Sequence, residues 1–136
     1  MKTEIEVLDT LCKFLNDNLD IPAVVDYPDT DNMKSSTMIY IEPEDAEYQP
    51  LTISSDLAIL HATIYIIAKK DTPTNLLQKV FRHSDEVFTL IRQNQTLNGF
   101  VEFSNITAMD YYPAVEANKN IKAIELSLDL QWTKDW

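Results

Sequence analysis

The chain has 136 residues, of which 45% are apolar and 24% charged, and it contains a single glycine, Gly99. This size and composition predict one globular domain with its own hydrophobic core and exclude an intrinsically disordered chain. The formal net charge of −11 opposes direct binding to DNA or to anionic lipid, and the scarcity of glycine excludes a glycine-rich phosphate-binding loop.

Cysteine usage and hydropathy indicate the compartment. One cysteine, Cys12, excludes an internal disulfide and indicates a reducing environment. Charged residues interrupt the first turns, so we expect no signal peptide, and the longest uncharged stretch, Leu57–Ala68, is too short to span a bilayer. The sequence therefore predicts a soluble protein made in a cytoplasm.

A first amphipathic helix is predicted at the N-terminus. Thr3 and Glu6 have the spacing of a capping box, and Ile21-Pro22 ends the helical pattern. The expected buried stripe recurs every three or four residues and consists of Ile5, Leu8, Cys12, Leu15 and Leu19. Because Cys12 lies in this stripe, it is interpreted as a small buried hydrophobe and not as a nucleophile.

Two short strands and an acidic loop are predicted next. Ala23–Tyr27 is the first strand candidate and Thr37–Glu42 the second, with a polar loop at Pro28–Ser36 between them. Pro43–Pro50 is bounded by prolines and rich in acidic residues, so we expect a loop there.

The third predicted strand is long and lies between Thr52 and Lys70. Its alternate residues are largely apolar on both faces, with Ala58, Leu60, Ala62, Ile64 and Ile66 on one face and Leu57, Ile59, His61, Thr63, Tyr65 and Ile67 on the other. Such a strand is typical of a central position covered on both sides. In a domain this small, we expect another subunit to provide the second cover.

A second helix and a final hairpin complete the chain. Thr72 at the N-cap and Pro73 at the first helical position predict a helix over Pro73–Gln93, and Gly99 is expected to supply a left-handed turn after it. The expected buried stripe of this helix consists of Leu76, Leu77, Val80, Phe81, Val87, Phe88 and Ile91. The next strand should run parallel to the long strand, joined to it by a right-handed crossover. Phe100–Tyr112 and Ile121–Trp132 are predicted to pair around a polar loop at Pro113–Asn120. The last strand is expected to have one buried and one wet face, because Ile124, Leu126, Leu128, Leu130 and Trp132 alternate with Glu125, Ser127, Asp129 and Gln131.

The chain is thus predicted to be a single α+β domain over residues 1–136. We expect a mixed, mostly antiparallel sheet of about five strands with two helices, in the order α-β-β-β-α-β-β.

No residue pattern predicts a chemical site. His61 and His83 lie on different elements without a Cys or second His at ligand spacing, so His61 is interpreted as a packed or interfacial histidine. The serines lack the glycine-flanked turn of a nucleophile, and no two carboxylates are positioned across a cleft. We expect no enzymatic activity, no cofactor and no metal ion.

Acidic residues concentrate between positions 26 and 47, where the only Lys or Arg is Lys34. They are Asp26, Asp29, Asp31, Glu42, Glu44, Asp45 and Glu47. Two interpretations stay open: solvated loops kept soluble by charge, or a surface that repels polyanions.

Several stretches of the chain carry a resemblance to a known family. They are the opening helix, IPAVVDYP, TMIYIEP, LHATIYIIAKKDTPTNLLQKVFRHSDEVFTLI, LNGFVEFSNITAMDYYP and AIELSLDLQW. In this order they resemble the tail-terminator (tail-completion) proteins of long-tailed bacteriophages and prophages. The likeness covers Ile5 to Trp132 and is one of pattern, without an invariant motif. The long acidic Pro43–Pro50 segment departs from the pattern expected of the family.

The resemblance implies a structural role without catalytic residues. Members of the family form six-membered rings that cap the tail tube and later join it to the head. For this chain it implies self-association into a hexamer, a tail-tube protein and a head-completion protein as partners, and a place in the host cytoplasm during assembly and then at the head–tail junction of the virion.

Two residue sets follow from this hypothesis. A channel that passes DNA should not hold it, so Glu42, Glu44, Asp45 and Glu47 are expected at the lumen or its rim. His61, Thr63, Tyr65 and Ile67, on the second apolar face of the long strand, are expected at the subunit interface.

Two alternatives from other classes remain. A small acidic protein can mimic DNA and inhibit a nucleic-acid-binding protein. The crowding of acids into loops and the bases Lys79, Arg82 and Arg92 on the second helix argue against this interpretation. The other alternative is a monomeric binding module of unknown ligand.

Overall fold

The computed structural model describes residues 2–111 and 120–136. Its elements are α1 (Glu4–Asn18), β1 (Ala23–Val25), the short 3₁₀ helix η1 (Thr30–Asn32), β2 (Thr37–Pro50), β3 (Ser55–Lys69), α2 (Pro73–Gln93), β4 (Phe103–Tyr111) and β5 (Ile121–Asp135). The predicted α+β class and the order α-β-β-β-α-β-β are confirmed. Most of the predicted loop at Pro113–Asn120 lies outside the described residues.

The five strands form one mixed sheet in the order β1-β2-β3-β5-β4. β1 pairs with β2 in parallel, and each of the other neighbouring pairs is antiparallel. β4 therefore points in the same direction as β3, as predicted. The two are not neighbours, because β5 lies between them and pairs with both.

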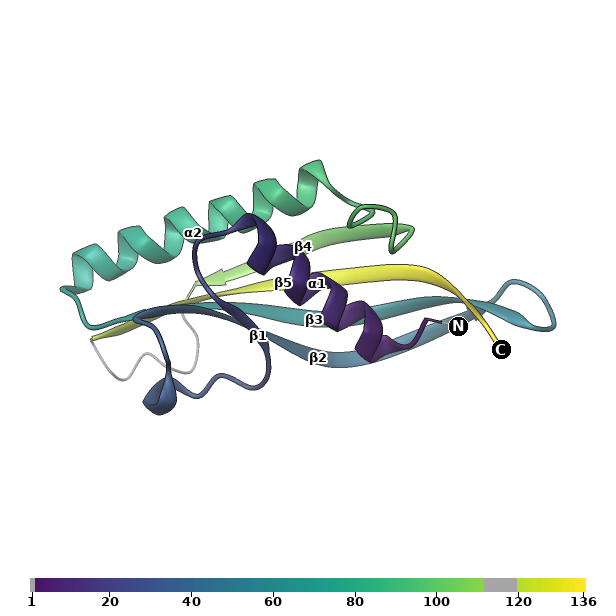
Figure 1. The fold of residues 1–136 in the computed structure, drawn as a ribbon, viewed down its shortest axis with the longest axis horizontal. Coiled ribbons are helices and arrows are strands. Elements are labelled where there is room, and N and C mark those ends of the chain that lie inside the picture. Colours follow the sequence, from purple (N-terminus) through teal and green to yellow (C-terminus); the bar gives the residue numbers. More distant parts are fainter. Residues whose placement is uncertain (1, 112–119) are drawn as a thin grey trace.

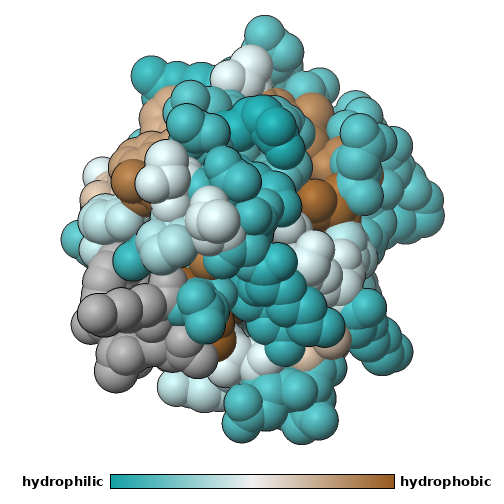
Figure 2. Space-filling view, turned by 90° about the vertical axis from the view of Figure 1, so that its left-hand side faces the viewer, coloured by the Kyte–Doolittle hydropathy of each residue, from teal (hydrophilic) through white to brown (hydrophobic). Residues whose placement is uncertain are grey.

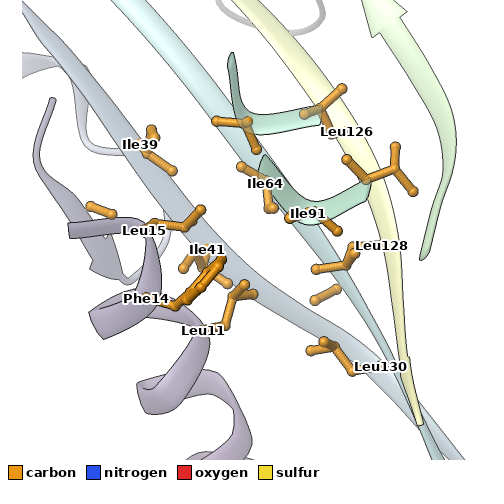
Figure 3. Packing of buried hydrophobic residues seen from close by; sticks show 14 of the residues in the cluster. Leu11, Phe14, Leu15, Ile39, Ile41, Ile64, Ile91, Leu126, Leu128 and Leu130 are labelled. Atoms are coloured by element: carbon orange, nitrogen blue, oxygen red, sulfur yellow. The ribbon is translucent and has the colours of Figure 1, made fainter. Parts of the chain in front are cut away.

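The α-helices α1 and α2 cover the same face of this sheet, and among the described residues no α-helix lies on the opposite face (Figure 1). α1 crosses β1 and β2, whereas α2 runs along β3, β5 and β4. The main core fills the space between the helices and the sheet (Figure 3). Leu11 and Leu15 of α1 and Ile91 of α2 meet Ile64 of β3 and Leu128 of β5 there, and all of them are at most 1% exposed.

α1 begins as predicted, because the Thr3 side chain accepts a hydrogen bond from the Glu6 amide. Its buried stripe differs from the predicted one: Ile5 is 55% exposed and Cys12 is only partly buried. The residues that face the sheet are Val7, Leu8, Leu11, Phe14 and Leu15. These five side chains have more apolar surface than the predicted stripe. The helix is therefore more stable when it is rotated so that they, and not the predicted stripe, face the sheet.

The expected loop at Pro43–Pro50 is wrong, because β2 continues as a strand to Pro50. It pairs with β3 along its whole length, with one irregularity between Pro43 and Asp45. β1 flanks β2 only as far as Ile41, so beyond that residue β2 has a strand neighbour on one side only. A strand at the edge of a sheet tolerates proline, since a missing N–H on the outer side breaks no hydrogen bond. Pro43–Pro50, which has the composition of a loop, is therefore an edge strand.

α2 has the predicted bounds and caps. Thr72 accepts a hydrogen bond from the Asn75 amide, and Pro73 occupies the first turn. Phe81, predicted in the buried stripe, is 41% exposed and stacks on Tyr111 of β4, with ring centroids 5.5 Å apart. After the helix, Gly99 has the predicted left-handed conformation, with φ of 87°.

Within residues 2–111 and 120–136, the chain itself covers the second face of β3 at one end only. A small apolar cluster of Met33, Met38, Tyr40, Ile67, Ile121 and Ala123 lies there, beneath the segment that contains η1. Lys69 holds this segment in place by donating a hydrogen bond to the Thr30 carbonyl at 2.6 Å. Figure 2 looks at this end of the molecule, where hydrophilic side chains predominate and apolar atoms form separate patches.

Candidate functional site

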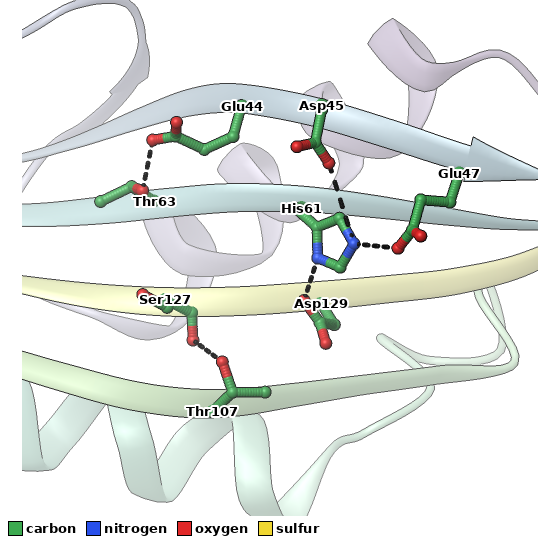
Figure 4. Close-up of polar contacts among 8 residues, drawn as sticks. All are labelled: Glu44, Asp45, Glu47, His61, Thr63, Thr107, Ser127 and Asp129. Atoms are coloured by element: carbon green, nitrogen blue, oxygen red, sulfur yellow. Dashed lines mark hydrogen bonds and ion pairs between the residues drawn. The ribbon is translucent and has the colours of Figure 1, made fainter.

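The candidate site is the side of the sheet that faces away from α1 and α2, here called the open face. Strand alternation and pairing bring both predicted residue sets to this one side. Figure 4 shows Glu44, Asp45 and Glu47 of β2 beside His61 and Thr63 of β3. The described residues of the open face that carry the argument are Glu42, Glu44, Asp45 and Glu47 of β2, His61, Thr63 and Tyr65 of β3, and Glu125, Ser127 and Asp129 of β5.

The expected lumen residues and the expected interface residues contact one another across β2 and β3. The Tyr65 hydroxyl donates to Glu42 Oε2 at 3.0 Å, and the Thr63 hydroxyl donates to Glu44 Oε1 at 2.7 Å. From the sequence, these two sets were expected in different environments, the lumen and the subunit interface. The structure joins them into one polar surface.

His61 is the centre of this surface. Its Nε2 lies 2.6 Å from Glu47 Oε2 and 3.8 Å from Asp45 Oδ1, and its Nδ1 lies 2.5 Å from Asp129 Oδ1. The imidazole thus bridges three adjacent strands, β2, β3 and β5. The interpretation of His61 as a packed or interfacial histidine did not include these contacts with carboxylates.

The carboxylates shift the pKa values of their neighbours. The hydrogen bonds with Glu47 and then with Asp129 raise the pKa of His61, because both favour the imidazolium form. Burial, and then the bond to Glu42, raises the pKa of Tyr65. Burial, followed by the nearby charge of Asp110, raises the pKa of the Glu125 carboxyl. Neighbouring carboxylates thus contribute to all three shifts, because negative charges gather on the open face.

Sequence reasoning missed the contribution of β5 and β4 to this site. Glu125 and Asp129 were recognised as the wet face of the last strand, but not as neighbours of the β2 carboxylates. On β4, Asp110 pairs with Glu125 in register and adds a further exposed carboxylate. Only the strand order, with β5 beside β3, brings these acids to the same surface.

The predicted interface set does not lie in one environment. His61 and Tyr65 are partly exposed, and Thr63 is 8% exposed on the open face. Ile67 is fully buried in the small apolar cluster at the end of the sheet. A second subunit that docks on this face would meet the polar side chains and not Ile67.

The geometry of the open face does not form a metal centre. Among the described residues, no group of three or more His, Cys, Asp or Glu side chains is arranged to hold a metal ion. Around His61, the carboxylates occupy opposite sides of the ring, so their oxygens do not converge on a common point with a free nitrogen. A surface depression lined by Lys69, Asp71 and their neighbours contains none of the predicted site residues.

A second exposed feature is the tip of the β2–β3 hairpin, which extends past the helices (Figure 1). Ile53 at the turn is fully exposed and Leu51 is 55% exposed. Beside the turn, the rings of Tyr48 and Trp136 lie 5.9 Å apart, and Lys134 lies within cation–π distance of both. The tip thus exposes two aliphatic side chains next to an aromatic pair.

Comparisons with known proteins add no family assignment: no protein-family model matches the chain, and no curated protein matches it. Among the described residues, no helix is both long enough and apolar enough to cross a membrane.

Proposed function

We propose that this protein is a structural subunit of a bacteriophage or prophage tail, a tail terminator whose copies form a ring that caps the tail tube and joins it to the head. The observation that carries the proposal is the acidic open face of a sheet whose two α-helices, α1 and α2, lie on the other side. The resemblance in element order and sequence pattern gives the class of protein.

The charges of the open face suit the wall of a channel for DNA. Carboxylates of β2, β5 and β4 lie on one side, and the ion pairs that Lys and Arg form among the described residues are all located elsewhere. The His61 ring contacts Glu47, Asp129 and Asp45, and the bonds with Glu47 and Asp129 raise its pKa, so three carboxylates surround this one imidazole. Such a surface repels the phosphates of DNA and lowers adhesion during passage.

The layered architecture supports an inward orientation of this face. When a sheet curves into a ring, the inner side has less room than the outer side. The layer formed by α1 and α2 occupies one side of the sheet only. The ring has enough room for both layers when the helices lie on the outside and the open face on the inside. In this orientation Glu44 and Glu47 point towards the lumen.

Native mass spectrometry over a range of concentrations, combined with proteomics of purified phage particles, tests the proposal. We expect a six-fold species and a few copies of the chain in every particle. An electron-microscopy reconstruction of the ring should show Glu42, Glu44, Asp45 and Glu47 on the channel side. Absence of the chain from purified particles would contradict the proposal, and an outward position of these residues would contradict the lumen assignment alone.

One observation favours a second candidate, a DNA mimic that inhibits a nucleic-acid-binding protein. The sequence disfavoured a DNA mimic because the acidic residues were expected to lie in loops. Glu42 to Glu47 instead lie on a strand, and with Glu125 and Asp129 they cover one face. This candidate predicts a monomer or dimer that binds a DNA-binding enzyme tightly and competes with duplex DNA. A monomer without any such affinity would indicate a binding module for another ligand.

A further inference from the structure

Asn98 and Gly99 lie in the turn between α2 and β4, and both are exposed. Because Gly99 is the single glycine of the chain, this is its only Asn-Gly step. Leu97, Asn98 and Gly99 have φ angles of 50°, 60° and 87°, so three successive residues are in the left-handed region. The turn contains none of the residues of the open face, so the proposed function does not account for it.

Asparagine is chemically labile, and an Asn-Gly step can rearrange without an enzyme. The backbone nitrogen of Gly99 attacks Cγ of Asn98, the Cγ–Nδ2 bond breaks, and ammonia leaves with the proton that the Gly99 nitrogen loses. Water then opens the cyclic succinimide at one of its two carbonyl groups, which gives either aspartate or isoaspartate. The reaction is therefore a deamidation, and water is its only co-reactant.

The surroundings of Gly99 leave room for this attack. Glycine has no Cβ atom that would shield its backbone nitrogen. A Cβ atom built at Gly99 would meet no atom within 4 Å outside Gly99 and its two chain neighbours. Asn105 provides the contrast, because it lies within β4 and the β-branched Ile106 follows it. Asn105 is thus an internal reference that should react slowly.

Thr96 holds the attacking nitrogen in place. The Gly99 N–H donates to the Thr96 carbonyl at 3.0 Å and to Thr96 Oγ1 at 3.1 Å. The Val101 N–H donates to the same carbonyl at 3.1 Å and fixes the turn further. The attack requires the Gly99 nitrogen to lose its proton and to move towards Asn98 Cγ, so both of its hydrogen bonds must break first. The contacts with Thr96 therefore slow the reaction in the folded chain.

We propose that Asn98 is a site of spontaneous deamidation and that the Thr96 side chain sets its rate in the folded chain. This inference goes beyond the proposed function and does not depend on it. The carboxylate that forms lies in a groove that Asn98 lines together with Lys2 and Lys13, so nearby cations offset the new charge of the aspartate product. The isoaspartate product instead lengthens the main chain of the turn by a methylene group, next to the Phe100 carbonyl that accepts a hydrogen bond from Lys2. Isoaspartate is therefore the product that distorts the turn.

Incubation of the full chain at mildly alkaline pH, followed by peptide mapping with mass spectrometry, tests the proposal. Thr96→Val keeps the shape of the side chain but removes its hydroxyl, whereas Thr96→Ser retains the hydroxyl. Because a hydrogen bond of ordinary strength is lost only in the valine variant, we expect Asn98 to deamidate about fivefold faster there than in the wild type. The serine variant should react at the wild-type rate. In concentrated urea all three proteins should react alike, with Asn98 roughly tenfold faster than Asn105 because glycine does not shield its nitrogen.

Global unfolding would also release the turn, so a variant destabilised elsewhere is the control. Thr72→Ala removes the side-chain cap of α2 and leaves Thr96 unchanged. We expect it to deamidate at Asn98 at the wild-type rate, and circular dichroism checks that every variant is folded. If Thr72→Ala reacts as fast as Thr96→Val, or if Thr96→Val reacts no faster than the folded wild type, the role of Thr96 is overturned. Equal rates at Asn98 and Asn105 in urea would overturn the site itself. None of these outcomes bears on the proposed ring.

Discussion

His61 Nε2 lies 2.6 Å from Glu47 Oε2, and the opposite nitrogen of the same ring lies 2.5 Å from Asp129 Oδ1. One imidazole therefore links the edge of the sheet to its centre. Because both partners are carboxylates, the protonated ring is favoured in the folded chain. This contact makes stability depend on pH.

We expect the free energy of unfolding to fall as the pH rises from 6 to 8.5. The pKa of His61 is raised in the folded state, so its stabilising contribution is complete below about 6.5, the value of an unfolded histidine, and is lost as the pH passes the folded value. The side chain is 32% exposed, so we expect an effect of about 1 kcal/mol. Urea unfolding of dilute protein measures it.

The matched control is His61→Gln, which keeps hydrogen-bonding groups but cannot become charged. We expect its unfolding free energy to change less than that of the wild type over the same pH range. Equal pH dependence in both proteins would show that the His61 contacts do not contribute.

Glu4 and Lys134 tie the first helix to the last strand. Lys134 is 6% exposed, and its Nζ lies 2.7 and 2.9 Å from the two Glu4 carboxylate oxygens. Glu4→Gln leaves a nearly buried ammonium without its counter-charge, so we expect a loss of about 2 kcal/mol in urea unfolding. Glu4→Gln/Lys134→Met should recover most of this loss, because methionine can pack beside the rings of Tyr48 and Trp136. A double variant less stable than Glu4→Gln would contradict this account.

The start of α2 depends on the Thr72 cap. Thr72→Ala removes the acceptor for the Asn75 amide, and we expect a loss of about 1 kcal/mol in the free energy of unfolding. Thr89→Ala makes the same change at an exposed position in the middle of the helix, where alanine has the higher helix propensity. This control should be neutral or slightly stabilising. Equal losses in both variants would show that the cap has no special role.

Gly99→Ala tests the left-handed turn between α2 and β4. A Cβ atom at this position would meet nothing within 4 Å, so the cost comes from the backbone conformation alone. With φ at 87°, we expect alanine to reduce the free energy of unfolding by about 1 kcal/mol. Gly99→Asn should cost less, because asparagine tolerates this region better. Calorimetric unfolding of the three proteins gives the ranking, and an alanine variant as stable as wild type would contradict it.

Local signals predicted most of the elements correctly. The cap at Thr72, Pro73 and the apolar repeat that follows were sufficient for α2, because helix ends and helix periodicity are encoded within a few residues. The alternation from Ile124 to Trp132 likewise predicted the buried side of β5, whose residues are at most 1% exposed. The isolated glycine at position 99 indicated the turn.

The β2 extension and the open face could not be predicted in this way. Prolines and acids between Pro43 and Pro50 have the composition of a loop, and only pairing with β3 at the edge of the sheet makes them a strand. His61 and Asp129 are 68 positions apart in the chain, and they meet because β5 is inserted between β3 and β4. Periodicity and caps are properties of neighbouring residues, so the sequence alone determined where the helices and most strands lie. Strand order and register depend on contacts between distant segments, so only the tertiary structure decided which charges share a surface.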